Sequence, residues 1–176
     1  MNKQKKTRNY ILCAFFTAII AVCSWITIPL AVPVTLQTFA VFAALEIMGG
    51  KWGTVSICIY ILLGVVGAPV FSGFRGGIGV LLGATGGYVV GFIALGLVWW
   101  AITSLLGRGI TIDILAMLVG LIVCYSIGTF WFVTVYTKLV SFSEAMKWCV
   151  IPFIIPDLFK LIIAFTVSEK VKKIMK

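Results

Sequence analysis

The chain has 176 residues, of which 62% are hydrophobic; this lies well above the roughly 45–50% usual in soluble domains and excludes an ordinary soluble protein. There is no histidine, and the 5 acidic residues are scattered, which argues against a zinc site, a Ser-His hydrolase or a paired-carboxylate enzyme. The net charge of +9 does not indicate nucleic acid, because the basic residues flank hydrophobic stretches, where topology and anionic lipid headgroups account for them.

Hydrophobic stretches between charges, prolines and glycines predict six membrane-spanning helices in a single membrane domain, 1–176. A bilayer core needs about 20 mostly apolar residues per helix. The expected spans are 9–28, 36–49, 53–67, 83–106, 112–136 and 148–170. The second and third are short, so they either do not cross fully or include apolar residues of the flanking loops. The predicted fold is an all-α integral membrane protein.

The Lys and Arg distribution predicts the orientation. With an even number of spans, both termini lie on one side, and the loops after the second and fourth spans lie on that side too. Ten basic residues fall there and three on the other side: Lys3, Lys5, Lys6, Arg8, Lys51, Arg108, Lys170, Lys172, Lys173 and Lys176 against Arg75, Lys138 and Lys147. Because basic residues concentrate on the cytoplasmic side, both termini are expected to be cytoplasmic.

The first span follows a basic start and contains YILCAFFTAIIAVC, residues 10–23. It resembles a signal peptide, but no small-x-small cleavage site follows and five further hydrophobic spans do, so we expect a retained helix. The 5 cysteines of the chain lie mainly in such apolar spans and form no C-x-x-C pair. We expect them to be inert thiols of the protein core.

The segment IPLAVPVTLQTFAVF, residues 28–42, is uncharged and carries two helix-stopping prolines. We expect an apolar, non-helical loop on the outer side, folded as a lid over the mouth of the helix bundle. Thr35, Gln37 and Thr38 at its far edge can donate and accept hydrogen bonds. They are either groups that bind a ligand or simply polar residues at a helix start.

No nucleotide motif is present. The string LEIMGGKW, 45–52, lacks the first glycine and the Ser/Thr of a Walker A loop, and GFRGGIGVLLGATGG has Leu82 in place of the third glycine of a dinucleotide fingerprint.

The glycine-rich segment 67–92 starts on the same outer side as the lid. Gly83, Gly87 and Gly91 recur every four residues, the spacing that allows close helix packing. Tyr88 can bring a ring and a hydroxyl to a pocket there. Arg75 offers a fork of donors suited to a carboxylate, or it lies at the membrane interface with its charged end in water.

The last span contains Asp157 and Lys160, one helical turn apart. Each costs about 2.5–3.5 kcal/mol at the centre of a span, so both need polar partners. Their i, i+3 spacing lets them form an internal ion pair or point together into a cavity. Pro152 and Pro156 disturb the same stretch, which favours a polar cavity. A carboxylate beside an ammonium suits a small ring with N–H groups next to a carbonyl, such as a ureido group.

Three strings carry a resemblance to a known family: IPLAVPVTLQTFAVF, LLGVVGAPVFSGFRGGIGVLLGATGGYVVGF and PFIIPDLFK, in this order. The chain resembles the BioY family, the biotin-specific substrate-binding subunits (S components) of energy-coupling factor (ECF) transporters, over nearly its whole length. The resemblance implies a six-helix fold with biotin as the transported ligand, and no bound cofactor. Asp157 and Lys160 match the acid and the lysine of the family's sixth helix, and Gln37 and Tyr88 fall on its lid and fourth-helix motifs.

The resemblance also implies a biological setting. Such a subunit lies in a prokaryotic cell membrane, with its site open to the outside, and works with a transmembrane coupling subunit of the EcfT type and two ATPases. It is not itself an enzyme. Small residues of the first helix dock on the coupling subunit in this family, and Ala14 and Ala18 have the spacing for close helix contact.

Three other hypotheses remain. The first is an S component for another small vitamin, such as thiamin or riboflavin. The second is an ATP-independent carrier or channel that uses Asp157 and Lys160 as a relay. The third, an intramembrane enzyme, has the lack of histidine and of clustered acids against it.

Overall fold

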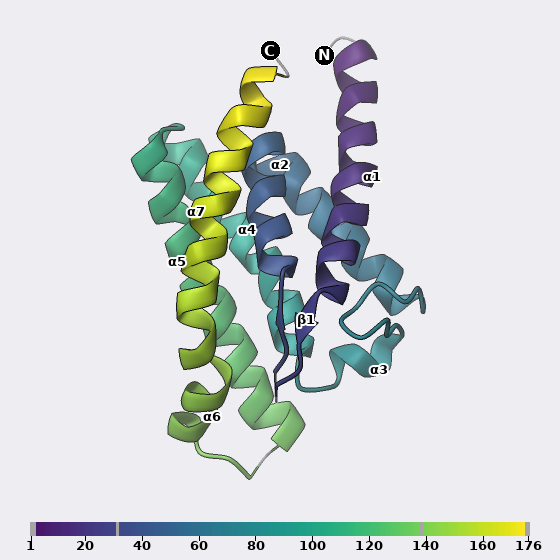
Figure 1. Ribbon diagram of the computed structural model, residues 1–176, viewed down its shortest axis with the longest axis vertical. Helices are drawn as coiled ribbons and strands as arrows, with labels where there is room; N and C mark the ends of the chain where they lie inside the picture. Colours follow the sequence, from purple (N-terminus) through teal and green to yellow (C-terminus); the bar gives the residue numbers. More distant parts are fainter. Residues whose placement is uncertain (1–2, 31, 138, 175–176) are drawn as a thin grey trace.

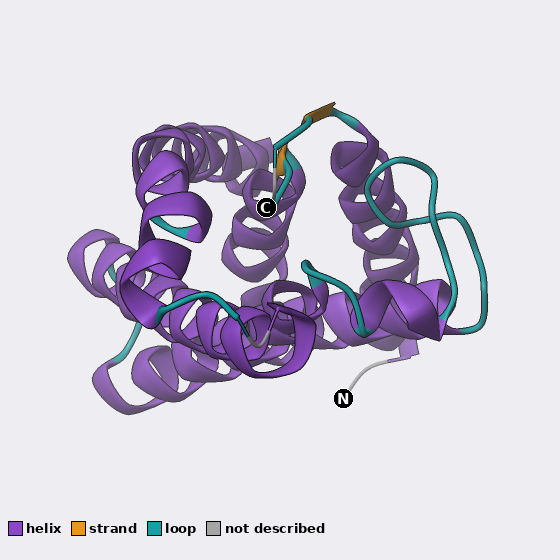
Figure 2. Cartoon of the chain, turned by 90° about the horizontal axis from the view of Figure 1, so that it is seen from below, coloured by secondary structure: helices purple, strands orange, loops and turns teal. Residues whose placement is uncertain are grey.

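The computed structural model describes residues 3–30, 32–137 and 139–174. Helices make up most of it, and two very short strands form a small pair at one side (Figure 1, Figure 2). The elements are α1 Lys3–Trp25, β1 Thr27–Ile28, β2 Val34–Thr35, α2 Gln37–Val65, α3 Ile78–Leu81, α4 Gly86–Leu106, α5 Ile110–Trp131, the π-helix η1 Phe132–Thr137, α6 Phe142–Cys149 and α7 Ile151–Ile174.

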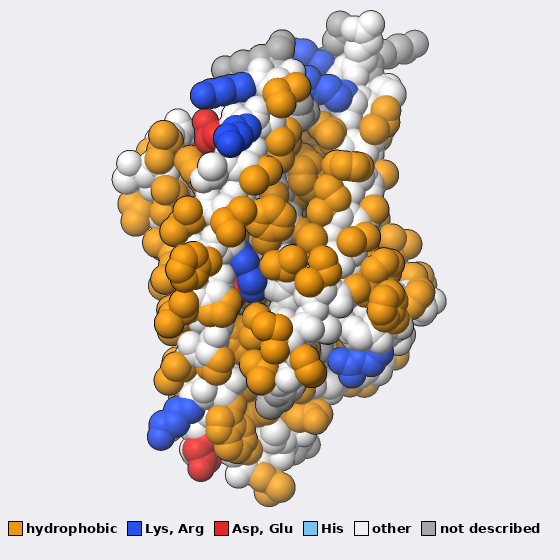
Figure 3. All heavy atoms as spheres, in the orientation of Figure 1, with side chains coloured by type: hydrophobic (Ala, Val, Ile, Leu, Met, Phe, Trp, Pro, Cys, Tyr) orange, Lys and Arg blue, Asp and Glu red, His pale blue; other side chains and the backbone are white. Residues whose placement is uncertain are grey.

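The helices have the length and polarity of membrane spans. Within the part of the chain that the structure describes, five are long and apolar enough to cross a bilayer: Gln4–Trp25, Gln37–Val65, Gly86–Leu106, Ile110–Thr137 and Ile151–Ile174. Large apolar side chains are exposed along them, and hydrophobic side chains cover most of the visible face (Figure 3). Exposed apolar surface of this extent is expected of a protein whose surroundings are lipid. The chain is therefore a multi-pass membrane protein.

Helix α2 contains nearly all of the two short predicted spans. It is one element of 29 residues, broken at Gly49, whose φ of 78° lies in the left-handed region that favours glycine. In Figure 1 its first half runs toward the end where the termini lie, and its second half turns back. A Cβ on Gly53 would lie 2.8 Å from the Cα of Leu45, so the two halves approach closely beside the kink. The expected spans 36–49 and 53–67 correspond to these two halves.

The segment predicted as a non-helical loop, 28–42, is shorter in the structure, because α2 already begins at Gln37. The loop prediction was wrong for 37–42, which the overlapping prediction of a span at 36–49 correctly made helical. Pro29 and Pro33 stop helix propagation locally, and no proline follows to prevent a helix after Leu36. The strands on either side of the prolines pair in an antiparallel way, Thr27 with Thr35 and Ile28 with Val34. Ala31 lies outside the described residues.

Helices α4 and α5 pack closely through glycines. A Cβ on Gly87 would lie 2.3 Å from Cβ of Trp131, and one on Gly91 would lie 2.8 Å from Sγ of Cys124. The packing role predicted for these two glycines is confirmed. Gly83 differs, because α4 begins only at Gly86 and Gly83 lies in the turn before it.

The last predicted span, 148–170, is divided at its start. Helix α6 ends at Cys149, and α7 begins at Ile151 with Pro156 inside it. Helix α6 starts with a capping box, in which Glu144 N–H donates to the Ser141 hydroxyl and the Ser141 backbone N–H donates to the Glu144 carboxylate. Two hydrogen bonds lower the pKa of the exposed Glu144 carboxyl. The larger effect comes from the Ser141 hydroxyl and the smaller from the Ser141 backbone N–H.

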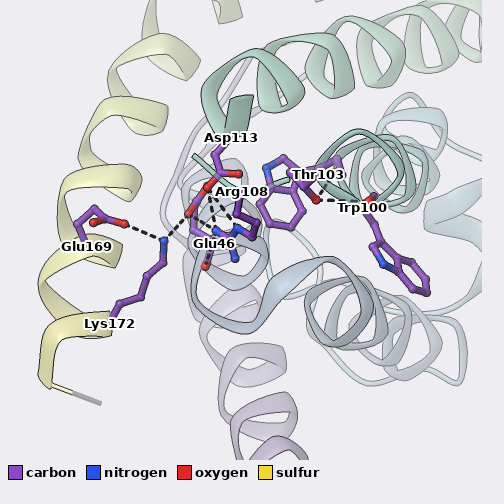
Figure 4. A network of polar contacts seen from close by, with 8 residues as sticks. Glu46, Trp100, Thr103, Arg108, Asp113, Glu169 and Lys172 are labelled. Atoms are coloured by element: carbon purple, nitrogen blue, oxygen red, sulfur yellow. Dashed lines mark hydrogen bonds and ion pairs between the residues drawn. The ribbon is translucent and has the colours of Figure 1, made fainter. Parts of the chain in front are cut away.

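The first residues of α1 and the last residues of α7 lie at the same end of the molecule, and α3 and α6 lie toward the other end (Figure 1). Arg108, between α4 and α5, and Lys172 of α7 both donate to Glu46 at the end of the molecule where the termini lie, here called the terminal end (Figure 1, Figure 4). Three of the basic residues used to predict the orientation are not fully described by the structure: Lys138, Lys176 and the side chain of Lys3 lie outside the described residues.

The terminal end holds a cluster of five charged side chains: Glu46, Arg108, Asp113, Glu169 and Lys172 (Figure 4). Glu46, only 1% exposed, accepts hydrogen bonds at Oε2 from Arg108 Nη2 at 2.8 Å and Lys172 Nζ at 2.7 Å. Arg108 also bonds to Asp113 at 3.0 Å, and Lys172 to Glu169 at 2.8 Å. The cluster therefore links the α2 kink, the α4–α5 turn and the end of α7.

Glu46→Gln is expected to destabilise the protein much more than Glu169→Gln. Both carboxylates accept from Lys172, but the side chain of Glu46 is 1% exposed and that of Glu169 is 41% exposed. The loss at Glu46 should be about 2–3 kcal/mol, against less than about 1 kcal/mol at Glu169. Thermal unfolding of the purified variants in one detergent measures the difference. Equal losses would show that burial does not set the strength of this cluster.

Candidate binding site

A cavity of about 60 Å³ lies among α2, α4, α5, α7 and the segments before α2 and α4. All six residues predicted to bind substrate line it: Thr35, Gln37, Arg75, Tyr88, Asp157 and Lys160. They come from four separate parts of the chain. The structure therefore brings the apolar segment before α2, the glycine-rich segment and the last helix to one place.

The charge pair forms the polar part of this cavity. Asp157 is 1% and Lys160 7% exposed, and Lys160 Nζ lies 2.6 Å from Asp157 Oδ1. The Thr38 hydroxyl donates to the same Oδ1 at 2.8 Å and accepts from Lys160 Nζ at 3.1 Å. The pairing expected from the i, i+3 spacing is present, and Thr38 of α2 closes a triangle of hydrogen bonds around it.

The second oxygen of Asp157 is also bonded. The Tyr125 hydroxyl of α5 donates to Asp157 Oδ2 at 2.6 Å. Two hydroxyls and an ammonium thus hold the two oxygens of the carboxylate. An ammonium has three N–H groups, and the described residues give that of Lys160 two acceptors, Asp157 and Thr38. One donor is left for a guest in the cavity.

Gln37 and Tyr88 make local hydrogen bonds beside the pair. Gln37 Nε2 donates to the Tyr60 hydroxyl at 3.0 Å, so its amide oxygen is still able to accept a hydrogen bond. The Tyr88 hydroxyl lies 3.1 Å from Thr129 Oγ1. The Tyr60 hydroxyl thus holds Gln37 in place and the Thr129 hydroxyl holds Tyr88. Both side chains still line the cavity.

Thr35 and Arg75 are more exposed than Gln37 and Tyr88. The Thr35 hydroxyl accepts a hydrogen bond from Gln37 N–H at 3.2 Å, so it also shapes the start of α2. Arg75 is exposed, and its Nε donates to Ser72 O at 3.1 Å, which leaves the guanidinium nitrogens Nη1 and Nη2 as further donors. Arg75 lies on a loop that is fastened to the end of α1, since Trp25 Nε1 donates to Pro69 O at 2.9 Å.

Ala14 and Ala18 lie away from the cavity. Both are exposed on α1, together with Ile11 and Phe15. They form a small-residue strip on an outer helix face.

Sequence reasoning missed two hydroxyl groups of the site, those of Tyr125 and Tyr60. It named Thr38 at the lid edge but did not place it against the charge pair. A tyrosine in the middle of an apolar span is a signal that could have indicated Tyr125, because a buried hydroxyl needs a partner. Nothing local indicates which partner it finds.

The arrangement suits a small, partly polar ring. Donors and acceptors gather around Asp157, and apolar side chains form the remaining wall: Phe71, Val80, Val89, Phe92, Leu121 and Phe153. Such a pocket can orient a guest by hydrogen bonds and bury its apolar part. Among the described residues, no group of three or more His, Cys, Asp or Glu side chains is placed to hold a metal ion.

Comparison with known proteins gives consistent matches. The model of the BioY family matches residues 1–176. A probable biotin transporter BioY from Pyrococcus horikoshii is 39% identical over 95% of this chain and 98% of that protein. A biotin transporter BioY from Thermotoga maritima is 38% identical over 95% and 97%. A crystal structure of the S-component for biotin from an ECF-type ABC transporter matches with a TM-score of 0.89 at 24% identity, covering 98% of this chain and 95% of the other, which shows a shared fold.

Proposed function

Because this chain belongs to the BioY family, we propose that it captures biotin for uptake, as the substrate-binding membrane subunit of an ECF-type ABC transporter. The observation that carries the proposal is the buried Asp157–Lys160 pair at the wall of a cavity. A pair that only stabilised the fold would not need an apolar cavity beside it. The relatives named as biotin transporters supply the identity of the ligand.

In the proposed complex the ureido ring of biotin lies against the charge pair. One of its N–H groups donates to Asp157, and the neighbouring carbonyl accepts from the free N–H of Lys160. Gln37 and Tyr88 border the ring, and Thr35 lies beside Gln37 at the start of α2. Arg75, exposed at the outer margin, binds the carboxylate of the valerate chain.

Isothermal titration of the purified protein with biotin tests this function. We expect saturable binding of one biotin per chain at micromolar ligand or below, and no binding of thiamin or riboflavin. Binding of thiamin or riboflavin in place of biotin would indicate an S component for another vitamin. Ion flux or pH-driven uptake in liposomes without an ATPase would indicate a carrier or channel.

The proposed topology has six crossings, with both termini in the cytoplasm and the site open to the outside. The kink at Gly49 supports it, because each half of α2 then crosses in one direction. The segment before α2, residues 28–36, is the proposed outer lid. Its support is that Val32 and Pro33 line the cavity.

ATP hydrolysis is assigned to two partner ATPases, and a transmembrane coupling subunit is the third proposed partner. Ala18→Trp is expected to reduce co-purification with these partners severalfold and to leave biotin affinity unchanged, because Ala18 is exposed on α1 and does not line the cavity. Co-expression with the tagged coupling module measures the first effect, and titration with biotin the second. Val90→Trp, on an exposed part of α4, is the matched control. Equal retention of both variants would place docking elsewhere.

A further inference from the structure

A second, larger hollow lies at the surface of the helix bundle, between α5, α6 and α7. Its volume is about 460 Å³. We call it the lateral groove and define it by its lining residues: Leu118, Leu121, Ile122, Tyr125, Ser126, Phe142, Met146, Val150, Ile154 and Leu158. Most of them belong to the membrane-spanning segments Ile110–Thr137 and Ile151–Ile174.

Among the residues that line the lateral groove, no side-chain donor is left without a hydrogen-bond acceptor. The lining contains two hydroxyls, and both already donate: Ser126 to Ile122 O at 2.8 Å and Tyr125 to Asp157 Oδ2 at 2.6 Å. A hollow of this kind does not hold ordered water, because water needs two or more polar partners. At the rim, Ile122 is 63% and Ile154 43% exposed, so the groove continues into the lipid-facing surface of α5 and α7.

The lateral groove shares a wall with the candidate binding site. Leu121 and Tyr125 line both the groove and the cavity. The ring of Tyr125 thus separates the two spaces, while its hydroxyl holds the carboxylate of the charge pair. Whatever fills the groove packs against the residue that orients Asp157.

We propose that the lateral groove binds an acyl chain of a membrane lipid, and that this chain positions Tyr125 and through it Asp157. An acyl chain is the occupant because the groove opens from spanning segments onto the bilayer and offers only apolar contacts and satisfied hydroxyls. Packing against the Tyr125 ring limits its movement, so Asp157 stays aligned with Lys160. Tyr125 is then a positioning residue. The coupling to Asp157 rests on the proposed biotin function, whereas acyl-chain binding does not.

Lipid retention tests whether the lateral groove binds an acyl chain. The variant Ser126→Phe fills the groove, and Val119→Phe places the same ring on an exposed part of α5 outside it. Each protein is purified in detergent, titrated with a phosphatidylglycerol and examined by native mass spectrometry. We expect wild type and Val119→Phe to retain one more lipid than Ser126→Phe. Equal lipid numbers in all three would overturn the site. So would light scattering that shows a wild-type dimer and a Ser126→Phe monomer, because the occupant would then be a second copy of the chain.

Biotin affinity, measured with and without added phosphatidylglycerol, tests whether the acyl chain positions Tyr125 and Asp157. We expect lipid to tighten binding about tenfold in wild type and Val119→Phe, and to leave binding by Ser126→Phe and Tyr125→Phe unchanged. Tyr125→Phe should still retain the lipid, because only its hydroxyl is lost. An equal lipid response in all four proteins would refute the coupling. If biotin does not bind wild type at all, the coupling fails together with the proposed function, and lipid retention still decides the acyl-chain site.

Discussion

Asp157→Asn is expected to weaken biotin binding by about 100-fold or more, because disrupting a buried, hydrogen-bonded ion pair costs several kcal/mol and each 1.4 kcal/mol is a factor of ten. Asp157 accepts from Lys160, Thr38 and Tyr125 at 2.6, 2.8 and 2.6 Å. Asparagine has the same shape but one oxygen and an NH₂ group that cannot accept. One of these donors loses its partner, and the ligand loses a charged acceptor.

The fold should survive this change, because asparagine leaves no cavity and its carbonyl can still accept from Lys160. Titration with biotin measures affinity, and thermal unfolding in the same detergent measures stability. Glu169→Gln, which neutralises an exposed acid on the same helix, is the control and should bind biotin as wild type does. If Asp157→Asn bound biotin as tightly as wild type, the pair would have no role in recognition.

Lys160→Ala is expected to abolish measurable biotin binding and also to destabilise the protein by about 3–5 kcal/mol. Lys160 is 7% exposed, and its ammonium balances the carboxylate of Asp157 at 2.6 Å. Alanine leaves that carboxylate buried without a countercharge and removes the methylenes that fill the surrounding space. Thermal unfolding and biotin titration on the same preparation measure both losses.

Two further variants separate charge from volume. Lys160→Met keeps the length of the side chain, so its stability loss reports mainly the missing charge. Adding Asp157→Asn to Lys160→Met removes the unbalanced carboxylate and should restore much of the stability, but not biotin binding. If the double variant were as unstable as Lys160→Met, an unpaired charge would not be the cause of the loss.

The sequence predicted the charged residues of the site better than the residues that form hydrogen bonds with them. Asp157 and Lys160 stand out because charge is costly in an apolar helix, whatever the rest of the chain does. Glu46 was not singled out by the same reasoning, although the structure buries it and gives it two basic partners. It lies three residues before Gly49, near a predicted span end, where an acid is easily taken to be hydrated.

The amino-acid sequence alone determined that this is a helical membrane protein and that Asp157 and Lys160 of its last helix need polar partners. Hydropathy, helix breaking by proline and the spacing of charges are local properties, so they can be read without contacts. The tertiary structure decided that the Gly49 kink joins two short spans in one element and that Thr38 and Tyr125 contact Asp157. These residues are 119 and 32 positions away from Asp157 along the chain. Their approach depends on how whole helices pack, and that is a property of the assembled bundle and not of any one segment.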